Sequence, residues 1–192
     1  MVAVTIAEAW PVIGRPFTVT DLDRMPDDGR RYELVDGLLI VSPAPSNPHQ
    51  LVVSELLFVL RQVCPPGFRP IIGPGVMMSS STELIPDLVV LPVGQLRDAK
   101  ITQPPRLAVE VRSPSTALVD LNVKRAVYEQ FGIESYWIVV PDVDKPELIA
   151  FELRDGRYEQ VAQVMGDECF QAARPFPVEV VPSQLMAGIP PG

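Results

Sequence analysis

The chain has 192 residues, of which 47% are hydrophobic and 21% charged, and its formal net charge is −8. This length suits one domain with a sizeable core, and no stretch approaches the roughly 20 apolar residues that a membrane-spanning helix needs. The acidic balance does not favour broad attraction to nucleic acid, although a local basic strip or a bound cation can offset it.

The two ends of the chain are expected to lie outside the core. Residues 1–15 lack the basic segment and cleavage site of a signal peptide and are expected to form a loosely held lead-in. Four prolines follow Phe176, which predicts an irregular tail and a core of about 17–176 within a single domain. Cys64 and Cys169 show no metal-ligand spacing, so we expect free, buried thiols and a cytoplasmic protein.

The N-terminal half is expected to form hairpins around one long helix. A short helix over residues 17–24, with Thr20 as its cap, leads to a turn at the sequence PDDG. A largely buried helix is predicted over residues 48–63, because Asn47 can cap it and Pro48 suits its first position. The predicted strands are 32–35 and 38–42, which flank the hairpin turn Asp36-Gly37, and then 69–72, 76–79 and 86–91.

The C-terminal half continues the alternation of strands and helices. A strand is predicted over residues 107–112, and a helix over residues 117–131 that ends at Gly132. The later predicted strands are 135–140, 148–153 and 158–164, the last two joined by a turn at Asp155-Gly156. Hairpins that alternate with helices predict an α/β fold in which helices flank a mixed β-sheet.

The predicted strand 107–112 carries charge within an apolar segment. Because side chains alternate along a strand, Glu110 and Arg112 share the face opposite to the three large apolar side chains. A buried ionised carboxylate needs a partner or a metal ion to offset its desolvation. One interpretation is a Glu110–Arg112 pair on an exposed sheet face, and the other is a metal ligand at Glu110.

Asp87 begins the predicted strand 86–91, directly after a proline. Alone, such an aspartate is usually a turn residue. If Glu110 lies on a neighbouring strand, however, two carboxylates face one spot and repel each other unless a cation binds between them. Hard oxygen ligands of this kind suit Mg²⁺ or Mn²⁺, so Asp87 and Glu110 form a candidate metal site.

Lys124 lies in the apolar stripe of the predicted helix, because positions that recur at about 100° per residue place it beside Tyr128 and Phe131. A lysine that faces the core needs an anion or a water-filled cleft. In the functional interpretation it orients or helps to deprotonate the water that attacks a phosphodiester, or stabilises developing charge, while Arg112 contacts a phosphate. The alternative is a snorkelling lysine that pairs with Asp120.

Two further residues are candidates for the same site. Glu33 either adds a carboxylate or pairs with a nearby arginine across two strands. His49, the only histidine, either ligates metal, moves a proton or binds phosphate, or is a solvent-facing residue of the first helical turn.

Five sequences occur in order between about Arg31 and Pro141: RYELVDG, PHQ, PDLVVL, LAVEVRSPST and DLNVKRAVYEQFGIESYWIVVP. Their order and spacing resemble the Uma-two family of restriction endonucleases, within the PD-(D/E)XK nuclease superfamily. The resemblance implies a restriction-endonuclease-like core.

The resemblance also implies roles for individual residues. The implied residues are the metal ligands Asp87 and Glu110, the active-site lysine Lys124, and the accessory residues Glu33 and His49. The position two residues after Glu110 holds Arg112 where the superfamily has lysine, so the lysine is expected to come from the following helix.

These observations lead to the hypothesis of a Mg²⁺- or Mn²⁺-dependent endonuclease that hydrolyses phosphodiester bonds in DNA. A homodimer is expected, since two-fold symmetry matches the two strands of a duplex. One alternative is a catalytically silent nuclease-fold protein that binds nucleic acid or another protein. Another is a structural dimer whose acidic residues serve solubility.

Overall fold

The computed structural model describes residues 14–112 and 119–189. A six-stranded central sheet has the strand order β10-β9-β8-β7-β6-β3, in which β7 and β8 are parallel and the other neighbours antiparallel. Its strands are β3 (Phe68–Ile72), β6 (Leu88–Pro92), β7 (Leu107–Val111), β8 (Ser135–Val140), β9 (Glu147–Arg154) and β10 (Arg157–Met165). The prediction of a mixed sheet is confirmed.

A second sheet has four strands in the order β2-β1-β5-β4. Its strands are β1 (Arg31–Val35), β2 (Leu38–Ser42), β4 (Val76–Ser79) and β5 (Thr82–Leu84), and the short β5 was not predicted. Asp36 and Gly37 join β1 to β2 with φ values of 48° and 80°, so the predicted hairpin is confirmed. A Cβ on Gly37 would lie 2.5 Å from Cβ of Pro16, so the packing also requires glycine there.

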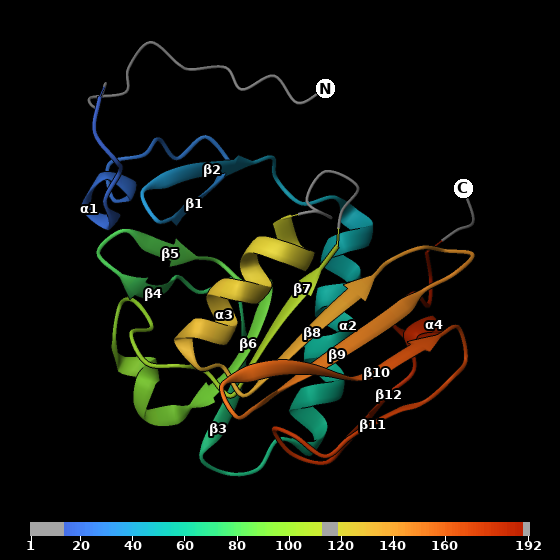
Figure 1. Ribbon diagram of the computed structural model, residues 1–192. Helices are drawn as coiled ribbons and strands as arrows, with labels where there is room; N and C mark the ends of the chain where they lie inside the picture. The colour runs from blue at the N-terminus through green and yellow to red at the C-terminus, as the bar shows by residue number, and fades with distance from the viewer. Residues whose placement is uncertain (1–13, 113–118, 190–192) are drawn as a thin grey trace.

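Two helices cover opposite faces of the central sheet (Figure 1). On one face, α2 (Asn47–Val63) buries Val52 and Leu56 among side chains of β6 and β7. On the other, α3 (Arg125–Phe131) packs Tyr128 against β7 and β8, near the second sheet. The alternation predicted for β7 is confirmed, because Leu107, Val109 and Val111 belong to the α2 side and Ala108 to the α3 side.

The helix predicted over residues 117–131 differs in its first part. Residues 117–118 lie outside the described chain, and Val119–Lys124 form π-helical turns before α3 begins at Arg125. The predicted end is confirmed, since Gly132 adopts the left-handed conformation with φ 88°.

Both predicted N-caps were wrong by one or two residues. Thr18, not Thr20, begins the four-residue helix α1 (Val19–Leu22) in a capping box with Asp21. Ser46, not Asn47, caps α2, because its extended backbone lets its side chain accept a bond from the His49 N–H.

The tail beyond Phe176 was predicted to be irregular, and this prediction was wrong. Strand β12 (Val178–Val180) pairs with β11 (Phe170–Ala172), and α4 (Pro182–Leu185) follows. Val178, Val180, Leu185 and Met186 are buried in the cluster that α2 forms. The prolines did not prevent regular structure, because one precedes a strand and one begins a helix, where its missing N–H is tolerated.

The 3₁₀ helix η1 (Val93–Arg97) follows β6. Cys64 and Cys169 are free thiols, but the expectation that both are buried was wrong, because Cys64 is half-buried and Cys169 is exposed. Within residues 14–112 and 119–189, no helix combines the length and the apolar character needed to cross a membrane.

Candidate active site

Four buried charged side chains meet where β1, the start of β6, the end of β7 and the beginning of α3 approach one another. Glu33, Asp87 and Glu110 are each 2% exposed, and Lys124 is 4% exposed. Three carboxylates at this depth require partners that offset their desolvation.

Two side chains of strand β1 form hydrogen bonds with the backbone of the segment that precedes β6. Arg31 and Glu33 are two residues apart and therefore point to the same face. Nη1 of Arg31 donates to the carbonyl oxygen of Ile85 at 3.2 Å, and the Ile85 N–H donates to Oε1 of Glu33 at 2.8 Å. This double contact fixes the chain just before Asp87 and explains how residues far apart in sequence share one site.

Asp87 accepts hydrogen bonds at both carboxylate oxygens. Oδ1 lies 2.7 Å from Nη1 of Arg31, whereas Oδ2 lies 3.0 Å from Nε2 of His49 and 2.8 Å from the N–H of Val111. Burial raises the pKa of Asp87, but the hydrogen bond from His49 and the charge of Arg31 outweigh it and hold that pKa below its usual value. The carboxylate is therefore ionised at neutral pH.

Lys124 lies between two carboxylates. Its Nζ is 3.0 Å from Oε1 of Glu33 and 3.0 Å from Oε1 of Glu110. The side chain thus faces the interior, as its place in the apolar stripe predicted. The alternative pairing with Asp120 falls on a side chain outside the described part of the structure.

Tyr128 lies one helical turn after Lys124 and contacts the same acceptor. Its hydroxyl donates to Oε1 of Glu110 at 2.6 Å. Burial first, and then the nearby charge of Glu110, raises the pKa of Tyr128 well above its usual value, so the hydroxyl keeps its proton and remains a donor.

Arg31 is the most exposed charged group of the site, with 23% of its side chain accessible. Burial lowers its pKa, but the charges of Asp87, Glu33 and Glu110 outweigh this effect and raise the pKa above its usual value. All three carboxylates therefore act on this one guanidinium.

His49 is buried, which rules out the alternative of a solvent-facing residue in the first turn of α2. Its Nε2 lies 3.0 Å from Oδ2 of the ionised Asp87, which can only accept, so this nitrogen is the donor. Its Nδ1 is buried without a hydrogen-bond partner among the described atoms. His49 therefore belongs to the site, because it contacts Asp87 directly.

Arg112 is half-buried, and its backbone N–H donates to the carbonyl oxygen of Val139 at 2.7 Å. Within the described part of the chain its guanidinium forms no ion pair, and Glu110 instead contacts Lys124 and Tyr128. The Glu110–Arg112 pair considered from the sequence is thus absent between these described residues.

Sequence reasoning missed Arg31 and Tyr128. Both had a signal in the pattern: Arg31 shares a strand face with Glu33, and Tyr128 stands four residues after Lys124 on one helix face. Neither signal identified the partner residue. Arg31 of β1 contacts Asp87, which precedes β6, and Tyr128 of α3 contacts Glu110 of β7.

The carboxylates of the site are candidate ligands for a metal ion. Within the described residues, no group of three or more His, Cys, Asp or Glu side chains is arranged to hold a metal. Mg²⁺ is commonly held by only one or two carboxylates, with water and substrate phosphates completing its shell. Asp87 and Glu110 fit that requirement in chemical type.

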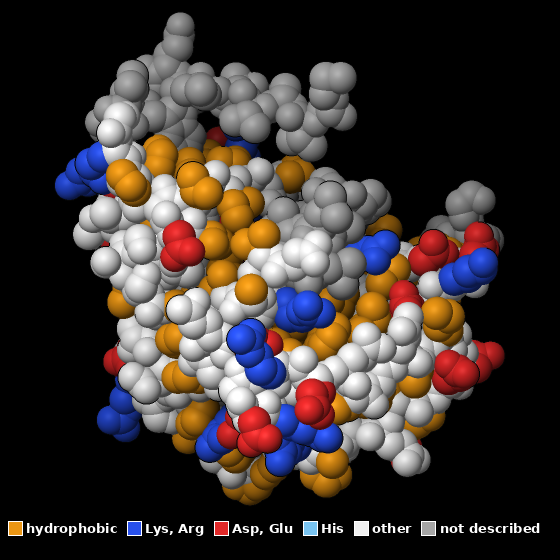
Figure 2. Space-filling view, viewed as in Figure 1, with side chains coloured by type: hydrophobic (Ala, Val, Ile, Leu, Met, Phe, Trp, Pro, Cys, Tyr) orange, Lys and Arg blue, Asp and Glu red, His pale blue; other side chains and the backbone are white. Residues whose placement is uncertain are grey.

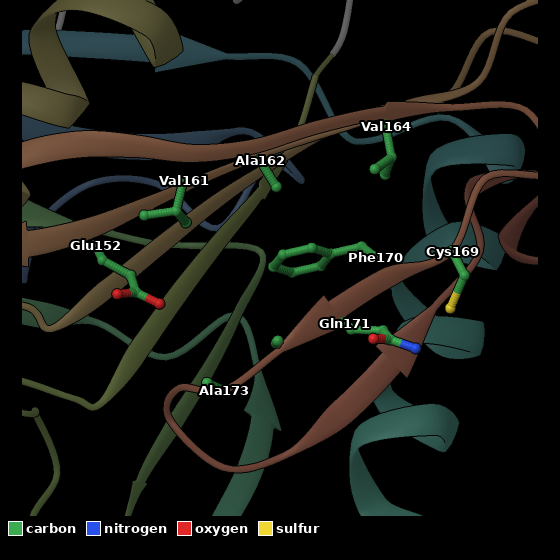
Figure 3. A pocket seen from close by; sticks show the side chains of 9 residues that line it. Glu152, Val161, Ala162, Val164, Cys169, Phe170, Gln171 and Ala173 are labelled. Carbon is green, nitrogen blue, oxygen red and sulfur yellow. The ribbon is translucent and has the colours of Figure 1, made fainter.

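Among the cavities lined by described residues, two lie away from this site. One of about 260 Å³ lies between β10 and β11, where Phe170 and Val161 line it beside the Glu152 carboxylate (Figure 3). The other, of about 310 Å³, is lined by residues that include Met78 and Phe131. Neither contains a charged residue of the site described above.

A family model and a solved structure each match most of the chain. The family model Uma2, described as "Putative restriction endonuclease", matches residues 19–184. A crystal structure from Anabaena variabilis ATCC 29413, described as "a putative nuclease belonging to DUF820", is similar with a TM-score of 0.69 and 17% identity. The match covers 89% of this chain and 98% of that one, and at this identity it shows a shared fold. No curated protein matches the chain.

Proposed function

This chain belongs to the Uma2 family of restriction-endonuclease-like proteins, and from that membership we propose that it is a metal-dependent nuclease that hydrolyses phosphodiester bonds. One observation carries the proposal: the buried Lys124 ammonium lies 3.0 Å from a carboxylate oxygen of both Glu33 and Glu110. A lysine held this way, beside a second buried acid at Asp87, supplies the donors and acceptors that phosphoryl transfer needs.

In this proposal, Asp87 and Glu110 hold Mg²⁺ or Mn²⁺. The cation, when bound, neutralises charge on the phosphoryl oxygens and makes a water more acidic. The chain's own contribution is orientation. His49 and the Val111 N–H fix Asp87, and Tyr128 fixes Glu110, so that both carboxylates keep one direction.

Lys124 acts as a hydrogen-bond donor in the proposed reaction. Glu33 and Glu110 keep its ammonium at the site, where it orients the attacking water and stabilises negative charge as the water oxygen bonds to phosphorus. The bond from phosphorus to the leaving oxygen then breaks. The proton lost by the water passes to solvent, and the leaving oxygen takes one up.

DNA is the proposed substrate, and the charge distribution bears on how it binds. Lys and Arg side chains on the face in Figure 2 are interspersed with Asp and Glu rather than gathered in one basic surface. A local contact is therefore required, and the half-buried Arg112, two residues after Glu110 and just past the end of β7, is the proposed phosphate contact. A homodimer and a cytoplasmic location are part of the same proposal.

The test is cleavage of supercoiled plasmid and of single-stranded DNA in Mg²⁺ or Mn²⁺, with the parent chain and Glu110→Gln side by side. We expect cutting by the parent, none by Glu110→Gln, and none by the parent in excess chelator. DNA binding without cutting by both proteins would instead support a catalytically silent binding module. Equal cutting by both proteins would remove Glu110 from the mechanism.

A further inference from the structure

We propose that Arg31 occupies the cation position of the metal-free site and must leave Asp87 before a divalent ion can bind there. The inference rests on the proposed function and adds a control of metal binding to it. Arg31 is then a positioning residue that holds Asp87 in the absence of metal and competes with the metal for one oxygen.

The hydrogen bonds of Asp87 identify that oxygen. Each carboxylate oxygen offers about two lone-pair positions. Oδ2 already accepts two bonds, from Nε2 of His49 at 3.0 Å and from the N–H of Val111 at 2.8 Å. Among the described residues, Oδ1 accepts one bond, from Nη1 of Arg31 at 2.7 Å. Oδ1 is therefore the oxygen with a lone-pair position left for a cation, and a cation bound there would stand directly beside the Arg31 guanidinium.

The charges of the site lead to the same conclusion. Nη1 of Arg31 lies 2.7 Å from Oδ1 of Asp87, so a positive charge already stands at this carboxylate. A divalent ion ligated by Asp87 and Glu110 would lie close to this positive group and be repelled by it. Metal binding and the Arg31–Asp87 ion pair are therefore mutually opposed.

The site contains two basic side chains, Arg31 and Lys124, and their solvent exposure differs. The Arg31 side chain is 23% exposed, whereas that of Lys124 is 5% exposed and lies between two carboxylates. Among the described residues, the Arg31 guanidinium donates to the Ile85 carbonyl, at 3.2 Å, and otherwise only to Asp87. Leaving the site brings it into water or onto a substrate phosphate, for which its planar donor pair is suited.

The experiment compares Mn²⁺ binding to the parent chain, Arg31→Gln and Asp87→Asn by calorimetry and by thermal melting. We expect Arg31→Gln to melt below the parent without metal, because Asp87 loses its partner. We expect it to bind Mn²⁺ at least about tenfold more tightly, a size typical of coupled binding equilibria. Its melting temperature should accordingly rise more than that of the parent when Mn²⁺ is added.

Arg15→Gln is the matched control. Arg15 also pairs with a buried aspartate, since its Nη1 lies 2.9 Å from Oδ2 of Asp21, but that pair belongs to α1. This variant should also lose stability, and its Mn²⁺ affinity should equal that of the parent. If Arg31→Gln does not fold without metal, Arg31→Lys keeps the charge with a shorter reach, and its affinity should still exceed that of the parent.

The outcomes separate this inference from the proposed function. If Asp87→Asn loses Mn²⁺ binding while Arg31→Gln and Arg31→Lys bind no more tightly than the parent, the role of Arg31 is overturned and the metal site stands. If Asp87→Asn binds Mn²⁺ as the parent does, the metal site itself is wrong. If neither the parent nor Arg31→Gln binds Mn²⁺, the inference is also overturned.

Discussion

The hydroxyl of Tyr128 donates a hydrogen bond of 2.6 Å to Oε1 of Glu110, the same oxygen that Nζ of Lys124 approaches to 3.0 Å. One helix face therefore supplies two donors, four residues apart, to a single atom of strand β7. This convergence fixes the direction of the carboxylate before any substrate or metal is present.

Replacing Tyr128 with phenylalanine removes one of these donors and keeps the ring. We expect DNA cleavage by Tyr128→Phe to fall by about 10- to 100-fold, as is typical when a group that orients a metal ligand is lost. The measurement is kcat and KM on one duplex, with the loss mainly in kcat. Tyr158→Phe is the control, because its hydroxyl also makes a 2.8 Å bond, but to the carbonyl oxygen of Ile133. Equal losses in both variants would indicate a general effect on packing.

Lys124→Met removes a cation from between two buried carboxylates. We expect no detectable cleavage and a loss of about 3–5 kcal/mol in the free energy of unfolding, because Glu33 and Glu110 are left without their shared partner. Urea unfolding and plasmid cleavage measure the two effects. Lys100→Met is the control, since Lys100 likewise contacts two carboxylates, those of Asp23 and Glu83, but outside the site. A Lys124→Met protein that folds and cuts at the parental rate would contradict the mechanism.

The lowered pKa of Asp87 predicts how stability changes with pH. A carboxyl group whose pKa is lower in the folded state contributes stability above its unfolded pKa of about 3.9 and loses it as pH falls through the folded pKa. Asp87→Asn should therefore be less stable than the parent at pH 7. The difference should shrink as pH falls below about 4. Free energies of unfolding from pH 7 to pH 3 test this, and a constant difference would show that ionisation of Asp87 is not the cause.

Because the C-terminal segment packs into the core, a substitution there should lower the stability of the protein, although it lies far from the site. Leu185 of α4 is 1% exposed and belongs to the core cluster of α2. Leu185→Ala should cost about 2–5 kcal/mol in the free energy of unfolding. Its exposed neighbour Gln184 makes the control, because Gln184→Ala should change stability by no more than about 0.5 kcal/mol. Equal melting of the two variants would show that α4 does not contribute to the core in solution.

Several features followed from the sequence because they obey local rules. The turn at Asp36-Gly37 was predicted, since both residues accept positive φ. The alternation along β7 followed from the two-residue repeat of a strand, and the end of α3 followed from the glycine at 132. These rules involve neighbours in the chain and need no knowledge of which elements meet.

The sequence also selected Glu110 and Lys124 as candidates, because charge in an apolar segment demands compensation. Asp87 and Glu33 were selected as further carboxylates for the same site. Only the tertiary structure decided how that compensation is made. Arg31 reaches Asp87 across 56 positions of the chain, and His49 reaches the same carboxylate across 38. Such pairings depend on the packing of β1 and α2 around β6, which no local pattern specifies. The C-terminal prolines were misinterpreted because tertiary packing also decides there. Burial against α2 outweighed a local preference for irregular structure.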